Sequence, residues 1–279
     1  AGRLDAPGGK VSITASNGDV LLTSNASVNA AGTTLIDWEN TIAELGLNYS
    51  AIDGGSVSLS GNNIILEKGS VIDVSGSDKV TNKILNRRGK IDSTSLASAA
   101  GSVAINYATT FTSKAQLLAK VASSWLSGGS LSLAKTSLTT LSLQEEQIAR
   151  WVANGFTDLS FSSLRAIDYI ESATDSNNRF GLAAASSLSL NASALIGTAD
   201  QDIWLRAPWI RLTNMVENTD GDTNSARAIA SLSSDTANLH LAGEFIDLQG
   251  NIGLSGFDKT TLQSDQALRL YDYYYSVNK

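Results

Sequence analysis

Cysteine is absent from this chain of 279 residues, and proline occurs only twice. Without cysteine the protein has no disulfide, no thiolate metal site and no cysteine nucleophile. Aromatic residues make up 6% of the sequence and hydrophobic residues 42%, so the core must be mostly aliphatic. No apolar run approaches the roughly 18 residues that a membrane-spanning helix needs, and we therefore expect no membrane insertion.

Positive charge is also scarce, with 20 Lys+Arg against 27 Asp+Glu and a formal net charge of -7. This balance argues against nucleic acid, or an anionic membrane, as a partner held by general electrostatics. The sequence also lacks the Gly-x-Ser-x-Gly, His-Glu-x-x-His and phosphate-loop motifs. We therefore expect no catalytic residues, no cofactor and no enzymatic activity.

Short apolar pairs separated by glycine or asparagine are what the sequence has in abundance. In "GGSVSLSGNNIILEKGSVIDVSG", residues 54–76, the pairs are Val57 and Leu59, Ile64 and Leu66, and Ile72 and Val74. The stretch "GGKVSITASNGDVLLTSNASVNAAG", residues 8–32, has the same layout. Each pair predicts a strand of three to five residues with one buried face. Three strands in about two dozen residues predict one turn of a solenoid.

The same pairs recur along the whole chain, so we predict an all-β solenoid of the parallel β-helix type with short helical and loop insertions. Later pairs include Val103 and Ile105, Leu159 and Phe161, Leu188 and Leu190, Ile203 and Leu205, Leu239 and Leu241, and Leu268 and Leu270. Residues 1–279 are expected to form one β-helix segment. The start, "AGRLDAPGGK", has no signal-peptide pattern and begins within the repeat, so we expect a piece of a longer protein.

Five insertions are expected to interrupt the repeat, at roughly 33–50, 77–100, 109–127, 142–157 and 214–230. Helical spacing predicts helices over 34–46, 113–127 and 142–155, and polar composition predicts exposed loops over 77–95 and 214–228. The third helix is the clearest, since Ser142 and Glu145 form a capping-box pattern and Gly155 is placed to end it. Its Trp151 is predicted to be buried against the solenoid.

Residues 54–76 resemble the repeat of filamentous haemagglutinin-type exoproteins, large adhesins exported by bacterial two-partner secretion. The resemblance is carried by Gly54, Gly55, Gly69, Ser70, Ile72, Asp73, Val74, Ser75 and Gly76. It is strong over 8–76 and looser over 101–138 and from 159 to the end. It implies a right-handed parallel β-helix, an outer-membrane secretion partner, and secretion to the bacterial cell surface. The absence of cysteine is also similar to that family.

Three functions follow from this fold. The first is a non-catalytic segment of a surface adhesin that projects from the cell and binds a host receptor or a surface polysaccharide. The second is a polysaccharide-binding or polysaccharide-processing β-helix. The third is a scaffold that presents another domain or an effector.

Carboxylates and the single histidine are the candidates for hydrolytic chemistry. Asp200 and Asp202 stand two apart just before a strand, but they also suit a corner beside Gly197. His240 lies between Leu239 and Leu241, so it points to solvent if those two leucines point inward. We expect a surface histidine and no catalytic carboxylate pair.

Aromatic residues are the candidates for ligand binding, because their faces stack on sugars and anchor interfaces. They are Trp204, Trp209, Tyr271, Tyr273, Tyr274 and Tyr275. The alternative for Trp204 is cover by an inserted helix, and for the tyrosines a strand that closes the end of the stack. A weaker candidate for Ca²⁺ comprises the alternating oxygen ligands Asp220, Asp222 and Asn224, although the glycine expected after the third ligand is missing. We expect a solvated turn there and no metal.

Overall fold

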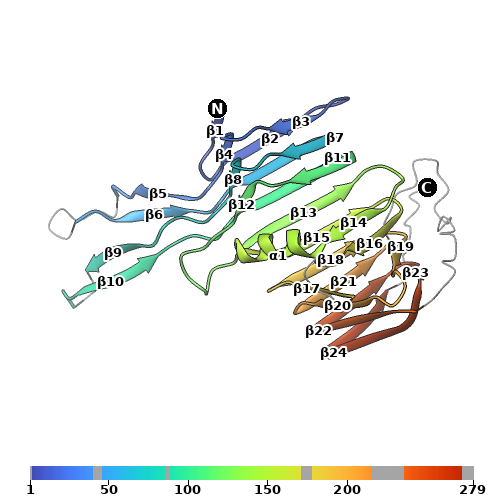
Figure 1. Cartoon of the computed structure of the whole chain (residues 1–279). Helices are drawn as coiled ribbons and strands as arrows, with labels where there is room; N and C mark the ends of the chain where they lie inside the picture. Colours follow the sequence, from blue (N-terminus) through green and yellow to red (C-terminus); the bar gives the residue numbers. More distant parts are fainter. Residues whose placement is uncertain (1, 40–45, 86–87, 171–177, 215–235, 272–279) are drawn as a thin grey trace, which may run out of the picture. The chain divides into compact units, whose positions relative to one another are not determined.

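The structure is a computed structural model that describes residues 2–39, 46–85, 88–170, 178–214 and 236–271 (Figure 1). Strands hold 61% of the residues, and many of them pair in parallel within large sheets, so the predicted all-β class is confirmed. Among the described residues the one helix is α1 (Glu145–Ala153). No helix in this part of the chain has the length and hydropathy needed to cross a membrane.

The chain forms two compact units. The first comprises Ala1–Ile105, Thr110–Leu131 and Ala153–Thr157, and the second comprises Asn106–Thr109, Ser132–Val152 and Asp158–Lys279. Strands β11 (Ser102–Ser113) and β13 (Gly129–Lys135) contribute residues to both. That residues 1–279 form one continuous segment stays a prediction.

Parallel strands build the first unit. One sheet has the order β1 (Arg3–Asp5), β4 (Ser27–Asn29), β8 (Val71–Asp73) and β12 (Gln116–Leu118). In another sheet, β7 (Ser56–Leu66) pairs with β2 (Lys10–Thr14) and then with β3 (Val20–Leu22). Val11 lies opposite Val57, and Val28 lies opposite Ile72. The two glycine-rich stretches of the sequence are therefore stacked on each other, like residue beside like residue.

The apolar pairs of residues 54–76 are buried as predicted. Val57, Leu59, Ile64, Leu66, Ile72 and Val74 are each at most 1% exposed. Ser58, Ser60 and Asp73 are partly exposed between them. One detail differs, because the first two pairs lie on the single continuous strand β7 rather than on two short strands. Gly61 lies within that strand and does not interrupt it.

Two antiparallel hairpins replace one predicted helix and one predicted loop. Residues 34–46 were expected to be helical, but β5 (Thr33–Ile36) pairs with β6 (Tyr49–Ile52), and residues 40–45 lie outside the described part. The loop expected over 77–95 contains the hairpin of β9 (Val80–Leu85) and β10 (Ile91–Leu96). The β-branched residues threonine, valine and isoleucine favour strands, and both hairpins contain them. This explains why residues 34–46 do not follow their approximate helical spacing.

The helix predicted over 113–127 is also wrong. Residues 116–118 form β12, and Leu117 lies opposite Ile72 and is fully buried. Leu117, which the helix would have placed on its apolar side, is therefore buried by the pairing of β12 with β8. Trp125, which the helix would have placed on its apolar side, is 67% exposed.

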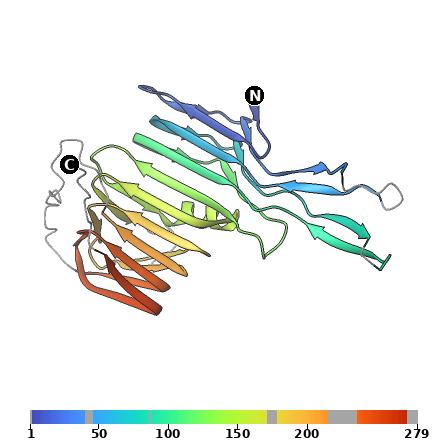
Figure 2. The same ribbon diagram turned by 180° about the vertical axis from the view of Figure 1, so that it is seen from behind.

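Asparagine side chains join the two hairpins, which lie side by side in both views (Figures 1 and 2). The Asn48 amide donates to the Lys83 carbonyl at 3.0 Å and accepts from the Lys83 N–H at 2.9 Å. Asn82 does the same to the backbone of Tyr49, at 2.7 and 2.9 Å. An amide side chain has the donor and acceptor of a peptide group, so these pairs continue the sheet where β6 and β9 do not form a ladder.

Removal of this bridge gives a measurable effect. Asn48→Ala leaves the Lys83 N–H and C=O without those partners, so we expect a loss of about 1–3 kcal/mol of stability. Amide hydrogen exchange at Lys83 should become faster, while exchange in β7 should stay unchanged. The control is Asn62→Ala, since Asn62 is an exposed asparagine on β7. Equal exchange rates at Lys83 in the two variants would contradict the bridge.

Parallel pairing also builds the second unit. One sheet has the order β14 (Leu141–Gln144), β16 (Ala166–Ile170), β19 (Ala194–Ile196) and β23 (Gly253–Ser255). The long β22 (Ala237–Gln249) pairs first with β20 (Asp202–Arg206) and then with β21 (Trp209–Thr213), and β24 (Phe257–Tyr271) runs along its whole length. Beyond these lie β17 (Arg179–Ala183) beside β20, and β18 (Ser187–Asn191) between β21 and β15 (Phe156–Ser163).

Some strand pairings of this unit have the predicted period, whereas others are longer, such as the 36 residues between Ile203 and Leu239. Leu188 lies opposite Ile210, and Phe180 lies opposite Ile203, so these partners are about two dozen residues apart in the chain. All four side chains are buried, in accordance with the apolar pairs read from the sequence. In the first unit the separation is about twice as long because the β5–β6 hairpin is inserted between Val11 and Val57.

The predicted third helix is present as α1, but it is shorter than the expected 142–155. Residues 142–144 belong to β14, so Ser142 does not cap the helix and the predicted capping box is not formed. The helix begins at Glu145, its apolar residues Ile148 and Trp151 are buried, and Gly155 follows it with a φ of 102°. Glycine reaches this left-handed conformation without steric cost, which is why it ends the helix here. The predicted burial of Trp151 is confirmed, since its side chain is 3% exposed.

Candidate functional site

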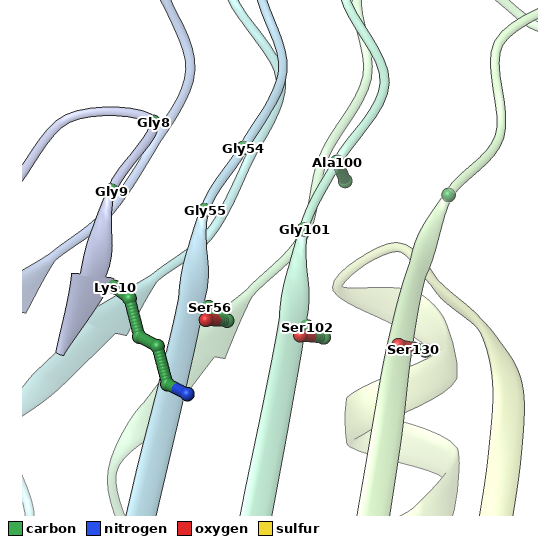
Figure 3. A pocket seen from close by; sticks show the side chains of 11 residues that line it. Gly8, Gly9, Lys10, Gly54, Gly55, Ser56, Ala100, Gly101, Ser102 and Ser130 are labelled. Atoms are coloured by element: carbon green, nitrogen blue, oxygen red, sulfur yellow. The ribbon is translucent and has the colours of Figure 1, made fainter. Parts of the chain in front are cut away.

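A shallow groove crosses the strand starts of the first unit (Figure 3). It has a volume of about 600 Å³ and is lined by Gly8, Gly9, Lys10, Gly54, Gly55, Ser56, Ala100, Gly101, Ser102, Gly128 and Ser130. Figure 3 shows Ser56, Ser102 and Ser130 in a row on adjacent strands, with Lys10 at one end of the row. The hydroxyl groups and one ammonium group can form hydrogen bonds, but the groove offers no acid–base pair.

Close backbone packing explains the glycines of this groove. The Ser56 N–H donates to the Gly9 carbonyl at 2.9 Å, and the Ser102 N–H donates to the Gly55 carbonyl at 2.9 Å. A Cβ atom on Gly55 would overlap the Gly9 carbonyl oxygen, and one on Gly101 would overlap that of Gly55. The glycines are therefore needed to bring successive backbones together, and the groove follows from that packing.

Trp204 is the centre of a polar and aromatic cluster on the outer face of the second unit. Its neighbours on the strand, Ile203 and Leu205, are fully buried, so the predicted outward position of Trp204 is confirmed. The indole N–H donates to Asp202 at 2.8 Å, and the His240 ring stacks on the indole with centroids 4.0 Å apart and planes 10° apart. His240 Nε2 also lies 3.1 Å from the Asp202 carboxylate. These contacts fix the orientation of the indole.

A pocket of about 300 Å³ lies against this cluster. It is lined by Arg179, Gly181, Leu182, Ala183, Trp204 and Arg206. Strand pairing places Gly181 on one side of Trp204 and His240 on the other. Because glycine has no side chain, the β17 side of the indole is left open where a larger residue would cover it. The guanidinium carbon of Arg206 lies 5.1 Å from the indole centroid.

The carboxylates near the pocket have close partners, whereas the two arginines are less fully paired. Asp202 is engaged by Trp204 and His240, and its distance to Arg179 Nε is 3.8 Å, long for a hydrogen bond. Arg206 forms no ion pair within the described part of the chain. Glu145 of α1 accepts a hydrogen bond from the Gly181 amide at 3.1 Å. The open side of the indole is thus bordered by two guanidinium groups, with the Glu145 carboxylate next to Gly181.

Trp209 belongs to a second cluster of the same kind. Its indole N–H donates to Asp247 at 2.8 Å, and Arg269 holds the same carboxylate with two bonds of 2.6 and 2.8 Å. Arg211 lies over the Trp209 ring at 4.4 Å. Arg269 also lies 5.9 Å from the ring of Tyr271, which is 46% exposed. A bidentate Arg–carboxylate pair of this type is a strong interaction. The Asp247 carboxylate and the Trp209 ring are therefore already in contact with side chains of the protein itself.

The remaining candidates are distributed as follows. Asp200 has a positive φ of 60° and its N–H donates to Thr236, which suits the predicted corner. Asp202 does not lie at the corner, because it is the first residue of β20 and pairs with Arg179. His240 faces outward as predicted, but the stacking and the Asp202 contact make it less solvated than expected. Tyr273, Tyr274 and Tyr275 lie outside the described residues, as do Asp220, Asp222 and Asn224. Within the described ranges no cluster of three or more metal-ligating side chains occurs.

A further titratable group, Asp168, lies in a partly buried setting on β16. One of its carboxylate oxygens is buried with no hydrogen-bond partner among the described residues. Burial raises the pKa of Asp168, and the Ser142 hydroxyl and the charge of Lys135 oppose that rise in part. Burial, together with the Asp168 charge, also raises the pKa of the nearby Tyr107 to about 12. Neither residue lines the two pockets described above, and burial is the main cause of both shifts.

The raised pKa of Asp168 predicts a pH-dependent stability. The folded chain binds this proton more tightly than the unfolded chain does, so ionisation of Asp168 costs stability as the pH rises through its folded-state pKa. Asp168→Asn keeps the shape and removes the charge. We expect it to raise the free energy of unfolding at pH 7 by on the order of 1 kcal/mol. The gain should shrink as the pH falls toward 4, in urea melts. A gain that stays constant between pH 7 and pH 4 would contradict this origin.

The sequence identified Trp204 but missed the residues that complete its pocket. Asp202, Trp204 and Arg206 alternate along β20 and so share its outer face, which the period of two could have revealed. Arg179 and Gly181 come from β17, and only strand pairing brings them to Trp204.

Comparison with known proteins adds no relative: no family model, no curated protein and no solved structure matches the chain.

Proposed function

We propose that this chain is a segment of a large secreted bacterial surface protein, folded as a right-handed parallel β-helix similar to that of filamentous haemagglutinin-type exoproteins. The observation that carries the proposal is the parallel, in-register pairing of successive repeats. In the second unit Leu141 lies opposite Ile167, and Ile167 lies opposite Leu195. In these two steps the chain returns to the same sheet, in the same direction, after about two dozen residues; elsewhere it returns after longer stretches, such as the 46 residues between Val11 and Val57. Repeated return of this kind, with aliphatic residues stacked inside, is typical of a β-helix.

The role we assign to this segment is attachment without catalysis. A β-helix contacts mainly its own neighbouring turns, so it can grow into a long, stiff projection from a cell. The lack of cysteine supports export through an outer-membrane secretion partner, since no disulfide hinders passage of an unfolded chain. A host receptor or a surface polysaccharide would be the partner.

Attachment can be tested directly with the purified chain. Beads coated with it should adhere to epithelial cells or to immobilised cell-surface glycans more than albumin-coated beads do. Arrays of glycans and host proteins would then identify the class of ligand. Binding no stronger than that of albumin on every surface would contradict an adhesive role for this segment and favour a shaft or a scaffold for another domain.

A second candidate, a polysaccharide-binding β-helix, is favoured by one observation, the pocket beside Trp204. An aromatic face in a polar pocket suits a sugar ring. Polysaccharide processing is a separate matter, which a reducing-end assay on the glycans that bind would decide. New reducing ends that appear with the protein, and that disappear in Asp200→Asn/Asp202→Asn, would contradict a non-catalytic function.

A further inference from the structure

We propose that the pocket of Arg179, Gly181, Leu182, Ala183, Trp204 and Arg206 binds a pyranose ring that carries a carboxylate, such as one residue of a polyuronate chain. This inference deepens the attachment role proposed above and depends on it for its biological setting. The binding site itself stands on four features of the described residues: an oriented indole, an open face, two guanidinium groups and a matching size.

The indole is held ready for a ligand. Asp202 accepts its N–H at 2.8 Å, and His240 covers one face at 4.0 Å. Such support from neighbouring groups lowers the entropy that a ligand would otherwise lose in ordering the side chain. His240 stabilises the indole from the side away from β17 and leaves the face toward β17 uncovered. A ligand stacked there would share the indole with the Arg206 guanidinium, which lies over the ring at 5.1 Å.

Gly181 keeps that face open. Every other outward residue opposite β20 on this strand has a side chain, since Arg179 lies opposite Asp202 and Ala183 lies opposite Arg206. A Cβ on Gly181 would lie 3.3 Å from the Glu145 carboxylate and more than 4 Å from Trp204. Gly181 has no positive φ, so its backbone does not require glycine. The missing side chain therefore leaves space on the indole side of Gly181, and the Glu145 carboxylate is the nearest group to that space.

Arginine decides the charge of the ligand. The Arg206 guanidinium lies 5.1 Å from the indole centroid, and Arg179 stands at the other end of the pocket with its side chain 58% exposed. A guanidinium presents paired N–H donors that match a carboxylate, and it can stack on an aromatic ring at the same time. A uronate ring stacked on Trp204 would carry its carboxylate to one of these groups.

The expected affinity is modest. The pocket of about 300 Å³ accepts one sugar ring, and a ligand of that size reaches a Kd of about 1 mM. The net charge of -7 opposes a polyanion at long range, whereas the two arginines attract it locally. Binding should therefore weaken with added salt, and a polymer that engages many copies of the chain on a cell should bind far more tightly than one ring.

The experiment uses the full chain, isothermal titration calorimetry and tryptophan fluorescence, with oligogalacturonate as the probe and maltotriose as the neutral comparison. Oligogalacturonate should bind and maltotriose should not. Arg206→Gln should weaken binding about tenfold, the typical value of a charge-assisted hydrogen bond. Gly181→Leu should abolish binding by filling the open face. Leucine suits a strand, so this variant should fold, as circular dichroism will show.

Matched controls exclude general effects. Trp38→Ala removes a tryptophan of the first unit that is 72% exposed, and Arg165→Gln removes an exposed arginine of the second unit. Both should bind as the wild type does. The inference is overturned if Gly181→Leu and Arg206→Gln bind normally, if maltotriose binds equally well, or if oligogalacturonate does not bind at 10 times the expected Kd of about 1 mM. Cell attachment that persists in Gly181→Leu would overturn this site as the adhesive one and leave the proposed attachment function intact.

Discussion

Gly55→Ala should destabilise the first unit by about 3 kcal/mol or more, the upper range for overpacking. The added Cβ would overlap the Gly9 carbonyl oxygen and press on the Gly9 nitrogen and carbonyl carbon as well. These are backbone atoms, held by the hydrogen bond from the Ser56 N–H to that same carbonyl. Relief of the clash therefore requires the paired strands β2 and β7 to separate at this point, which breaks backbone hydrogen bonds between them.

The matched control is Gly18→Ala in the same unit. A Cβ there would lie 3.9 Å from that of Ala15, an ordinary van der Waals contact, and Gly18 has no positive φ. Its substitution should change the free energy of unfolding by less than about 1 kcal/mol and should raise it if it restricts the unfolded chain. Urea denaturation of both variants tests the difference. Equal midpoints would mean that the two backbones do not approach so closely.

Local patterns were sufficient to predict the strands that carry a buried face. Val57 and Leu59, or Ile203 and Leu205, alternate with polar residues, and a period of two defines a half-buried strand without knowledge of its partner. The two glycines at 54 and 55 could be recognised as part of a repeat. The structural reason for glycine at position 55 could not be predicted, because it depends on how closely the Gly9 backbone approaches.

Segments without a one-sided apolar pattern were predicted less well. In β10 nearly every residue is exposed, so burial leaves no period of two to detect. Around Leu117 the apolar residues fit a helix and a strand equally well, and pairing with Ile72 in the layer below decides for the strand. The third helix could be predicted from its own apolar residues, Ile148 and Trp151, and from its stop signal at Gly155. Its start could not, because Ser142 pairs within β14 and does not cap the helix.

The candidate site shows the same division between local and long-range information. The outward position of Trp204 follows from its own strand. The stacking of His240 and the gap at Gly181 follow from the pairing register of three neighbouring strands. Gly181, Trp204 and His240 lie side by side on β17, β20 and β22. Gly181 and Trp204 are 23 residues apart in the chain (204 − 181), and Trp204 and His240 are 36 apart (240 − 204), so no single period in the sequence aligns them.

Trp151→Ala is expected to cost about 3–5 kcal/mol, as for other buried tryptophans. The side chain is 3% exposed although it belongs to a helix rather than to a strand with an inward face. Helix α1 has nine residues, too short to be stable alone in water, so it depends on packing of its apolar side. With Trp151 removed, Ile148 is the one other buried residue of the helix. The melting temperature should fall, while far-ultraviolet circular dichroism of the folded variant remains rich in β structure.

Trp125→Ala provides the comparison, because Trp125 is 67% exposed and its removal opens no cavity. Its melting temperature should stay close to that of the wild type. The helix also links this prediction to the pocket beside Trp204, since Glu145, its first residue, accepts a hydrogen bond from the Gly181 amide. Loss of Trp151 should therefore loosen β17 and weaken oligogalacturonate binding, whereas Trp125→Ala should leave binding unchanged. An unchanged melting temperature for Trp151→Ala would show that α1 is not anchored through this side chain, and the support it gives to β17 would then have to come from Glu145 alone.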